Sequence, residues 1–219
     1  MTDHPQTRVL YDHPMSGNCQ KIHMMLACLD LPYETIFVDV LNGATKERAF
    51  TRMNPMQQIP VLRDGAQTIC DSQAILVYLA AKYDPDWADR TPIGMAKIAE
   101  WLSFAAKEVS NGPQMARLWH LTKEDGIDIG KATASGLKVL AQLQAHLADR
   151  DWLCLDRPTI ADIAVFPYIA TARDGELPLD EYPAVCAWLR RIRDLPGYRP
   201  LKGTREMAEK YKNSKEAYE

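Results

Sequence analysis

Residues 54–65 read NPMQQIPVLRDG and contain the two signals that decide the fold. Pro60 has no backbone N–H to donate, so it can stand only at the mouth of the strand that follows it. Asp64-Gly65 is a strong turn signal, which predicts that the chain returns as a second strand over residues 67–70. We therefore expect a β-hairpin that a proline introduces.

The flanking segments extend this hairpin into a small α/β unit. Residues 8–11 form a short apolar run, and apolar residues recur with helical spacing over 22–29. Residues 33–40 predict a mostly buried strand, parallel to the first. Residues 71–83 predict another helix with Ser72 as its N-cap. The order is β-α-β, a connecting segment and then β-β-α.

A change of composition follows this unit. Residues 84–92 hold two prolines and three aspartates without periodicity, which suits an interdomain linker. The sequence therefore predicts an α/β domain over 1–83 and an all-α domain over 93–219, with a solvated tail or marginal helix from Lys202 onward. In the second domain helical periodicity covers residues 94–121, 127–147, 160–171 and 183–195.

Composition excludes several classes of protein. Of the 219 residues, 47% are hydrophobic and 25% are charged, as in a folded globular protein. The formal net charge of -3 gives no footprint for nucleic acid, and no apolar run is long enough to enter a membrane. Five scattered cysteines form neither a disulfide framework nor a metal site. We expect a cytoplasmic protein without a metal.

Thr159 and Asp162 have the spacing of a capping box, in which each side chain accepts from a backbone N–H of the other end of the motif. This is a structural signal. On the cap alone, Asp162→Ala is expected to cost about 1 kcal/mol of stability.

Two further sites suit a ligand that resembles an amino acid or peptide. Asp71 and Ser72 begin a helix, where free N–H groups and the helix dipole favour a ligand carboxylate and the Asp71 carboxylate can accept from an ammonium group. Ser72 acting only as a cap is the alternative. Ile59-Pro60 is trans by default, whereas a cis bond would turn the backbone of Ile59 toward an extended peptide.

Residues 14–22, PMSGNCQKI, lie at the start of the first helix. Ser16 there can cap the helix, or donate to an anionic sulfur and lower the pKa of a bound thiol. Asn18 offers amide donors to the same place. Cys19 lies one turn inside the helix, which is the position of a packing residue rather than a nucleophile.

Four motifs, LYDHPMSGNCQKI, NPMQQIPVLRDG, CDSQAILVYL and PTIADI, occur in order over residues 8–200. Together they resemble the soluble glutathione transferase family. The resemblance implies a thioredoxin-like N-terminal domain, an all-helical C-terminal domain, a likeness to the serine-type enzymes, glutathione as co-substrate and a homodimer.

The resemblance also assigns residues around the sulfur. Ser16 matches the serine that donates to the glutathione sulfur, and Asn18 matches an asparagine used nearby in some bacterial groups. Pro60 matches the family's cis-proline, and Ile59 matches the residue before it, which pairs with the cysteinyl backbone of glutathione.

The two ends of glutathione are assigned in the same way. Asp71 and Ser72 match the residues that hold the γ-glutamyl end, whereas Gln58 and Lys46 stand nearest the glycyl carboxylate. Gln57-Gln58 replaces the commoner Gly-Lys or Lys-Lys, which removes a positive charge from the glycyl end.

The implied function is conjugation of the glutathione thiolate to small hydrophobic electrophiles. Met15, Met115, Leu118 and Trp119 are the candidates for the electrophile pocket. A glutathione-dependent disulfide or peroxide reductase and a non-catalytic interaction protein with the same fold are the alternatives.

Overall fold

The computed structural model describes residues 8–201, so the expected tail from Lys202 and the outer ends of the two expected domains lie outside the described residues. Four strands form a mixed sheet in the order β2-β1-β3-β4, in which β1 is parallel to β2 and antiparallel to β3, and β3 is antiparallel to β4. The strands are β1 (Arg8–Asp12), β2 (Tyr33–Phe37), β3 (Val61–Asp64) and β4 (Gln67–Cys70).

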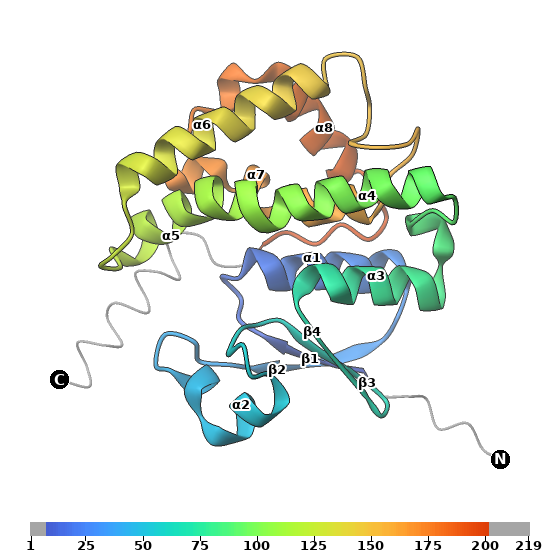
Figure 1. Ribbon diagram of the computed structural model, residues 1–219, viewed down its shortest axis with the longest axis vertical. Coiled ribbons are helices and arrows are strands. Elements are labelled where there is room, and N and C mark those ends of the chain that lie inside the picture. The colour runs from blue at the N-terminus through green and yellow to red at the C-terminus, as the bar shows by residue number, and fades with distance from the viewer. Residues whose placement is uncertain (1–7, 202–219) are drawn as a thin grey trace.

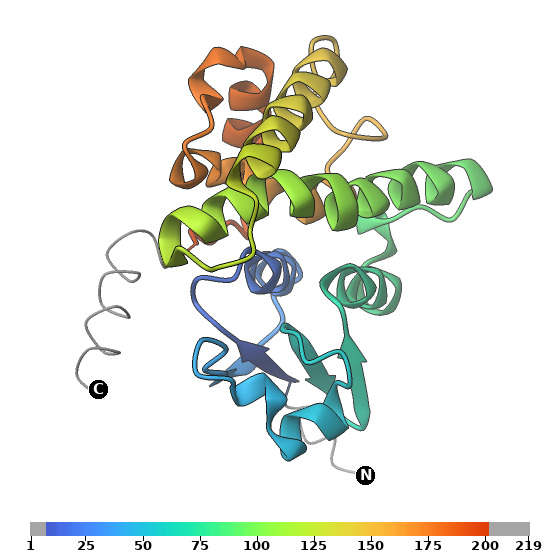
Figure 2. The same cartoon turned by 60° about the vertical axis from the view of Figure 1, so that its left-hand side comes forward.

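Helices cover both faces of this sheet. Figures 1 and 2 show α1 (Gly17–Cys28) and α3 (Ser72–Tyr83) between the sheet and the helical domain, and α2 (Arg48–Met53) on the opposite face. A short 3-10 turn, η1 (Ala44–Lys46), precedes α2. The sheet and its helices form the thioredoxin-like domain that the sequence predicts.

The hairpin after Pro60 forms as expected. The Ile59-Pro60 bond is cis, and β3 returns as β4 with Asp64 opposite Gln67. The cap of α3 differs from the prediction, because Asp71 is the N-cap and Ser72 is the first helical residue.

The prediction of a mostly buried second strand is wrong. β2 ends at Phe37, and four of its five residues are exposed, with Phe37 54% accessible. The reason is its place in the sheet, because β2 is an edge strand that pairs only with β1. An edge position leaves one side of the strand to solvent.

The second domain is helical throughout the described part of the chain. None of these helices is long and apolar enough to span a bilayer, within residues 8–201. The connecting segment holds the short 3-10 turn η2 (Pro85–Trp87). The elements after it are α4 (Pro92–Phe104), the π-helical segment η3 (Ala105–Gln114), α5 (Met115–Thr122), α6 (Ile129–His146), α7 (Ile160–Ala170), η4 (Ala172–Gly175), η5 (Leu179–Glu181) and α8 (Pro183–Arg193).

The helix expected over residues 94–121 is interrupted by the wider turns of η3. Pro113 lies inside this segment, and a proline removes one helical hydrogen bond and clashes with the preceding turn. Gly112 allows a close approach here, because a Cβ at this position would lie 2.7 Å from the backbone nitrogen of Gly136 on α6. The absence of a side chain at Gly112 therefore lets η3 and α6 pack closely.

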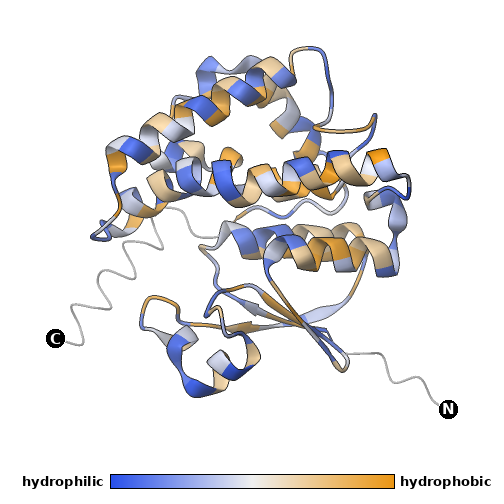
Figure 3. Ribbon diagram, in the orientation of Figure 1, coloured by the Kyte–Doolittle hydropathy of each residue, from blue (hydrophilic) through white to orange (hydrophobic). Residues whose placement is uncertain are grey.

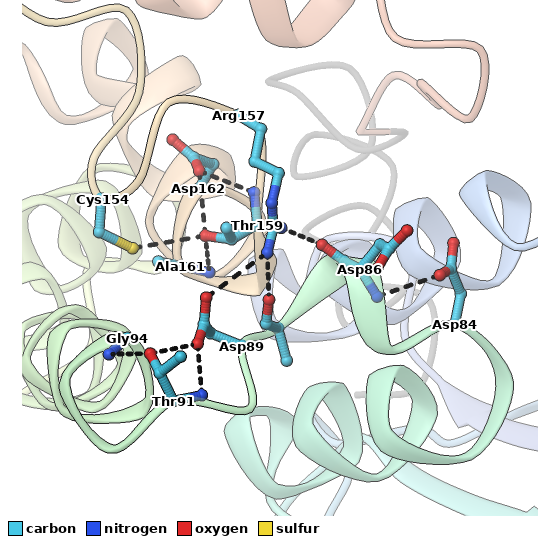
Figure 4. A network of polar contacts seen from close by, with 11 residues as sticks. Asp84, Asp86, Asp89, Thr91, Gly94, Cys154, Arg157, Thr159, Ala161 and Asp162 are labelled. Carbon is cyan, nitrogen blue, oxygen red and sulfur yellow. Dashed lines mark hydrogen bonds and ion pairs between the residues drawn. The ribbon is translucent and has the colours of Figure 1, made fainter.

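Residues 84–92, expected as a linker, are held against the helical domain. Figure 4 shows Arg157 reaching this segment, where it donates to the carbonyl oxygens of Asp86 and Ala88 and lies 3.8 Å from the Asp89 carboxylate. Thr91 caps α4 by accepting from the Gly94 N–H. The connection between the domains is thus fixed at several points.

One hydrophobic core extends across both domains. The buried side chains of α1 and α3 pack against those of α4 and α7, and Figure 3 shows the hydrophobic colouring of α1 and α3 along the run beneath α4. Its fully buried members include Leu10, Ile22, Met25, Ile75, Leu79, Val109, Leu140, Ile163, Ile169 and Trp188. A smaller cluster of Val38, Phe50 and Val61 lies between the sheet and α2.

Asp162 is the polar centre of the helical domain. Its carboxylate accepts from the Thr159 N–H at 3.0 Å, which with the Thr159 hydroxyl forms the capping box of α7, and also from the Leu153 N–H at 3.0 Å and Trp188 Nε1 at 2.9 Å. Burial raises the pKa of Asp162 to about 6, although these donors favour the charged form. The capping box is thus part of a network that also holds α8.

We predict that Asp162→Ala lowers the free energy of unfolding by roughly 3 kcal/mol, because three buried N–H donors lose their acceptor. Asp128→Ala is the matched control, since Asp128 caps α6 at the exposed surface by accepting from the Lys131 N–H. That variant should lose about 1 kcal/mol. Urea unfolding of both variants measures the difference, and equal losses would contradict the role of the network.

Candidate functional site

A cleft of about 620 Å³ lies where α1 and α3 begin, between the two domains. Eight of the residues predicted for the site line it: Met15, Ser16, Asn18, Gln58, Ile59, Asp71, Ser72 and Leu118. A second hollow of about 740 Å³ lies beside α4 and residues 149–156 and contains none of the predicted residues. The chemistry of the cleft, rather than its size, therefore marks the candidate site.

At the start of α1, Ser16 is the N-cap. Its Oγ accepts from the backbone N–H of Cys19 at 3.2 Å. Accepting this bond uses a lone pair of the hydroxyl and not its proton. The capping role and the donor role that the sequence left open are therefore compatible. The positive end of the α1 dipole points to the same place and favours an anion there.

Cys19 packs inside the domain, as its position in the helix predicts. It has no exposed surface, and burial raises the pKa of its thiol far above the ordinary range, which the Ser16 hydroxyl offsets only in part. A reactive cysteine requires a thiolate that solvent can reach. Cys19 therefore does not supply the sulfur of this site.

At the start of α3, Asp71 and Ser72 present different groups. Asp71 Oδ1 accepts from the N–H groups of Gln73 and Ala74 at 2.9 and 3.0 Å, and its backbone has a φ of 71°, a value that a residue other than glycine rarely adopts. Ser72 is buried, and its Oγ lies 3.4 Å from Asn18 Oδ1. Asn18 thus connects the starts of α1 and α3.

Asn54 shapes the loop that precedes Pro60. This residue is buried, its Nδ2 donates to the Gln58 carbonyl at 2.7 Å, and its Oδ1 accepts from the Met56 N–H at 3.1 Å. Gln58 and Ile59 are thereby held at the wall of the cleft. Asn54 was not among the residues predicted for the site, although an Asn-Pro pair at the start of a loop is a known turn signal.

Lys46, the other candidate for the glycyl end, does not line the cleft. It is exposed at the end of η1, whereas its neighbour Thr45 is buried and does line the cleft. A short 3-10 turn points successive side chains in different directions. The structure therefore brings Thr45 to the cleft in place of Lys46.

The helical domain contributes one face of α5. Leu118, Leu121 and Thr122 have the spacing of a single helical face, and they line the cleft. Met115 and Trp119, the other two predicted pocket residues of this helix, do not line the cleft. The Trp119 ring instead lies 3.7 Å from Lys123 Nζ.

Two buried side chains of the helical domain, which the sequence analysis missed, fix the thioredoxin-like domain in place. Arg117 pairs with Asp174 at 3.0 Å and donates to the Met15 carbonyl at 2.9 Å. The Tyr168 hydroxyl interacts with the backbone N–H groups of Gly17 and Asn18, and burial raises its pKa, so that it remains a phenol. A charged residue within an apolar helix, such as Arg117, was the available signal.

His13 also faces the cleft and was missed. It is 2% exposed, its Nδ1 accepts from the Met15 N–H at 3.3 Å, and its ring lies 5.4 Å from that of Phe37. Burial lowers the pKa of this imidazole. For metals, no group of three or more His, Cys, Asp or Glu side chains that could hold an ion occurs within residues 8–201.

Comparison with known proteins assigns both domains. Residues 10–87 match the family model described as glutathione S-transferase, N-terminal domain, and residues 124–196 match glutathione S-transferase, C-terminal domain. Glutathione S-transferase 3 of Zea mays is 30% identical over 200 residues, which cover 86% of this chain and 90% of that protein.

The chain belongs to the glutathione S-transferase family.

Solved structures agree with this assignment. A glutathione S-transferase from Pseudomonas fluorescens is 31% identical, with a TM-score of 0.83 over 90% of this chain and 99% of that one. A glutathione transferase family member of the same organism, solved with two glutathione bound, is 25% identical, with a TM-score of 0.78 over 90% and 92%. In this member of the family, the cleft lies between the N-terminal domain and the helices η3 and α5 that follow it.

We predict that Gly17→Ala destabilises the contact between the domains. An added Cβ would lie 2.7 Å from two ring atoms of Tyr168, so the ring or α1 must shift, at a cost of about 1–3 kcal/mol. Gly130→Ala is the matched control, because its Cβ would make only ordinary contact on α6. That variant should gain up to about 1 kcal/mol. Thermal unfolding measures both, and a Gly17→Ala variant as stable as Gly130→Ala would contradict the contact.

Proposed function

We propose that this protein conjugates the glutathione thiolate to small hydrophobic electrophiles. The observation that carries the proposal is a single cleft that contains the Ser16 hydroxyl at the start of α1, Ile59 before the cis-proline, and Asp71 with Ser72 at the start of α3. A volume of about 620 Å³ suits a small molecule.

Glutathione would lie along the cleft in one direction. Its γ-glutamyl group has both an ammonium and a carboxylate, which suit the Asp71 carboxylate and Ser72 at the positive end of the α3 dipole. The cysteinyl backbone would pair with Ile59, and the glycyl end would lie near Gln58. This direction brings the sulfur to Ser16.

The chemical task of the site is to ionise the thiol. A cysteine thiol has a pKa near 8.5, so only a few per cent is thiolate at neutral pH. Each unit by which the pKa falls gives nearly tenfold more nucleophile and corresponds to about 1.4 kcal/mol. A hydrogen bond from the Ser16 hydroxyl and the positive end of α1 both favour the thiolate.

The opposite wall would receive the electrophile. Ala105 and Ala106 of η3 and Leu118 and Leu121 of α5 provide apolar surface, and Met15 adds to it from the loop before α1. Ser110 and Gln114 add polar groups on the same side. Apolar surface beside the sulfur suits a small hydrophobic substrate.

We predict that Ser16→Ala raises the pKa of enzyme-bound glutathione by one unit or more and lowers kcat/KM at pH 6.5 by about tenfold or more, because the thiolate loses its donor. The thiolate absorbance of the complex as a function of pH measures the first effect. Conjugation of a chromogenic electrophile measures the second.

Thr91→Ala is the matched control for the lost cap, because Thr91 caps α4 away from the cleft. It should lose a similar stability, about 1 kcal/mol, and leave the thiol pKa unchanged. An unchanged thiol pKa in Ser16→Ala would transfer the donor role to Asn18 or to a backbone N–H. Binding of glutathione without any conjugation would favour a reductase or an interaction protein.

We also propose that the protein forms a homodimer. Exposed apolar side chains support this, namely Val77 on α3 and Ile93 and Met95 on α4, which are 47%, 68% and 57% accessible. Apolar groups that gather into one exposed patch mark protein–protein interfaces, and these three side chains are proposed as part of such a patch.

We predict a sedimenting species of twice 24.8 kDa for the native chain, and dissociation when Ile93 and Met95 are both replaced by Asp. Leu137→Asp is the control, because Leu137 is an exposed apolar residue of α6, 38% accessible. Analytical ultracentrifugation distinguishes the species. A monomeric wild type, or a dimer that only Leu137→Asp dissociates, would contradict the proposal that this surface forms the dimer interface.

A further inference from the structure

Lys21 lies behind the start of α3 and has no role in the mechanism above. It is 1% exposed, and its Nζ lies 3.5 Å from Ser72 Oγ and 5.9 Å from the centre of the Tyr168 ring. Among residues 8–201, no carboxylate oxygen lies within the 4.0 Å of an ion pair with this Nζ. The chain therefore carries an amine into its interior without an ion-pair partner in the described residues.

Such a position is costly for a charged group, because a buried ammonium is normally paired with an anion or loses its proton. Burial lowers the pKa of Lys21 to about 7, and the nearby Asp71 opposes this effect. A hydrophobic side chain of similar size would fill the same space without the cost. An anionic ligand near Lys21 would therefore stabilise its charged form.

The surroundings of Ser72 indicate where that anion lies. Ser72 Oγ has two acceptor atoms beside it, Asn18 Oδ1 at 3.4 Å and Gln73 Oε1. It has one proton to donate and lone pairs to accept with. Lys21 Nζ, which has only donors, approaches the same oxygen from the interior. The N–H groups of Gln73 and Ala74 already donate to Asp71 Oδ1, so the cleft side of Ser72 is what is left to a ligand.

We propose that Lys21 is a positioning residue for the γ-glutamyl carboxylate: it donates to Ser72 Oγ from behind, directs the Ser72 proton toward the cleft, and places a positive charge behind the bound carboxylate. This inference rests on the proposed function, because glutathione supplies the carboxylate. Asp71 faces the ligand ammonium from the other side, so both charges of the γ-glutamyl group are matched.

The test compares two ligands in two proteins. Lys21→Met should weaken glutathione binding by about ten- to a hundredfold, the range of a charge-assisted hydrogen bond. It should change binding of 4-aminobutyryl-cysteinyl-glycine, which lacks only the γ-glutamyl carboxylate, by less than twofold. Isothermal calorimetry measures all four affinities.

Lys82→Met is the control for general damage. Lys82 is on α3 and pairs with the buried Asp64 at 2.7 Å, but it does not line the cleft. It should leave the ratio of the two affinities unchanged. If Lys21→Met weakens the binding of both ligands equally, or of neither, the role assigned to Lys21 is overturned and the proposed function is not affected. Failure of the wild type to bind glutathione overturns the proposed function and this inference together.

The stability of the ligand-free variant gives an independent result. The lowered pKa of Lys21 means that its cost is fully present below pH 7 and is lost as the pH rises toward the unfolded value of about 10.4. Lys21→Met should therefore melt at a higher temperature than the wild type at pH 6, with a smaller difference at pH 9. A lower melting temperature at both values would make Lys21 a structural residue and overturn the inference.

The wild type alone provides a third measurement, with S-methylglutathione so that no thiol titrates. At pH 8 Lys21 is mostly neutral in the ligand-free protein, so it should take up part of a proton when the ligand carboxylate binds. At pH 6 Lys21 is already mostly charged, so the proton uptake on binding should be smaller. Of the groups around it, the pKa values of Cys19 and Tyr168 are raised and that of His13 in the cleft is lowered, so these three stay neutral at pH 8. Asp71 also faces Lys21, from the start of α3.

Calorimetry in two buffers with different ionisation enthalpies measures the uptake. The S-methyl derivative of 4-aminobutyryl-cysteinyl-glycine is the control ligand, because it keeps the ammonium that faces Asp71 and lacks the carboxylate. Binding of this control ligand should be accompanied by a smaller uptake of protons. Equal uptake with both ligands would overturn the inference.

Discussion

The contact between α1 and α7 holds the two halves of the molecule in the arrangement that creates the cleft. Gly17 lies against the Tyr168 ring, whose hydroxyl interacts with the first N–H groups of α1, and Arg117 secures the preceding loop through the Met15 carbonyl. Ser16 and Asn18, at the start of α1, also line the cleft. The end of the thioredoxin-like domain that lines the cleft is therefore positioned by side chains of the helical domain.

This arrangement concentrates polar groups where the core would otherwise be apolar. Lys21, Tyr168 and Asp162 are each almost fully buried, and burial changes the pKa of each in the direction of its neutral form. Asp162 gains three N–H donors in return, which explains its structural role. Lys21 has no comparable set of partners. Strained or costly features of this kind, including the φ of 71° at Asp71, are expected where a protein binds a ligand.

Sequence patterns predicted the order of the elements because each signal is local. Pro60 with Asp64-Gly65 gave the hairpin, and Thr159 with Asp162 gave the start of α7. The exposure of β2 was missed because sequence periodicity does not show which strand lies at the edge of a sheet. The interruption by η3 was missed because the helical spacing of apolar residues continues through its wider turns. Pro113 was the sequence signal for an interrupted helix.

The site was predictable to a different extent in each domain. Ser16, Ile59, Asp71 and Ser72 stand at strand and helix ends, which local signals identify, and all four line the cleft. The wall from the helical domain depends on the rotation of α5, so the sequence could not show that Leu118 rather than Trp119 faces the cleft. The partners of Lys21 come from elements 51 and 147 residues further along the chain, Ser72 and Tyr168, which no local pattern connects.

The central claim is that this cleft holds glutathione with its sulfur at Ser16. A crystal structure of the protein with glutathione tests it most directly. The account predicts the sulfur within hydrogen-bonding distance of Ser16 Oγ, the cysteinyl backbone beside Ile59, and the γ-glutamyl carboxylate on Ser72 at the start of α3. Glutathione bound in the reverse direction, or bound elsewhere with the cleft empty, would contradict the account.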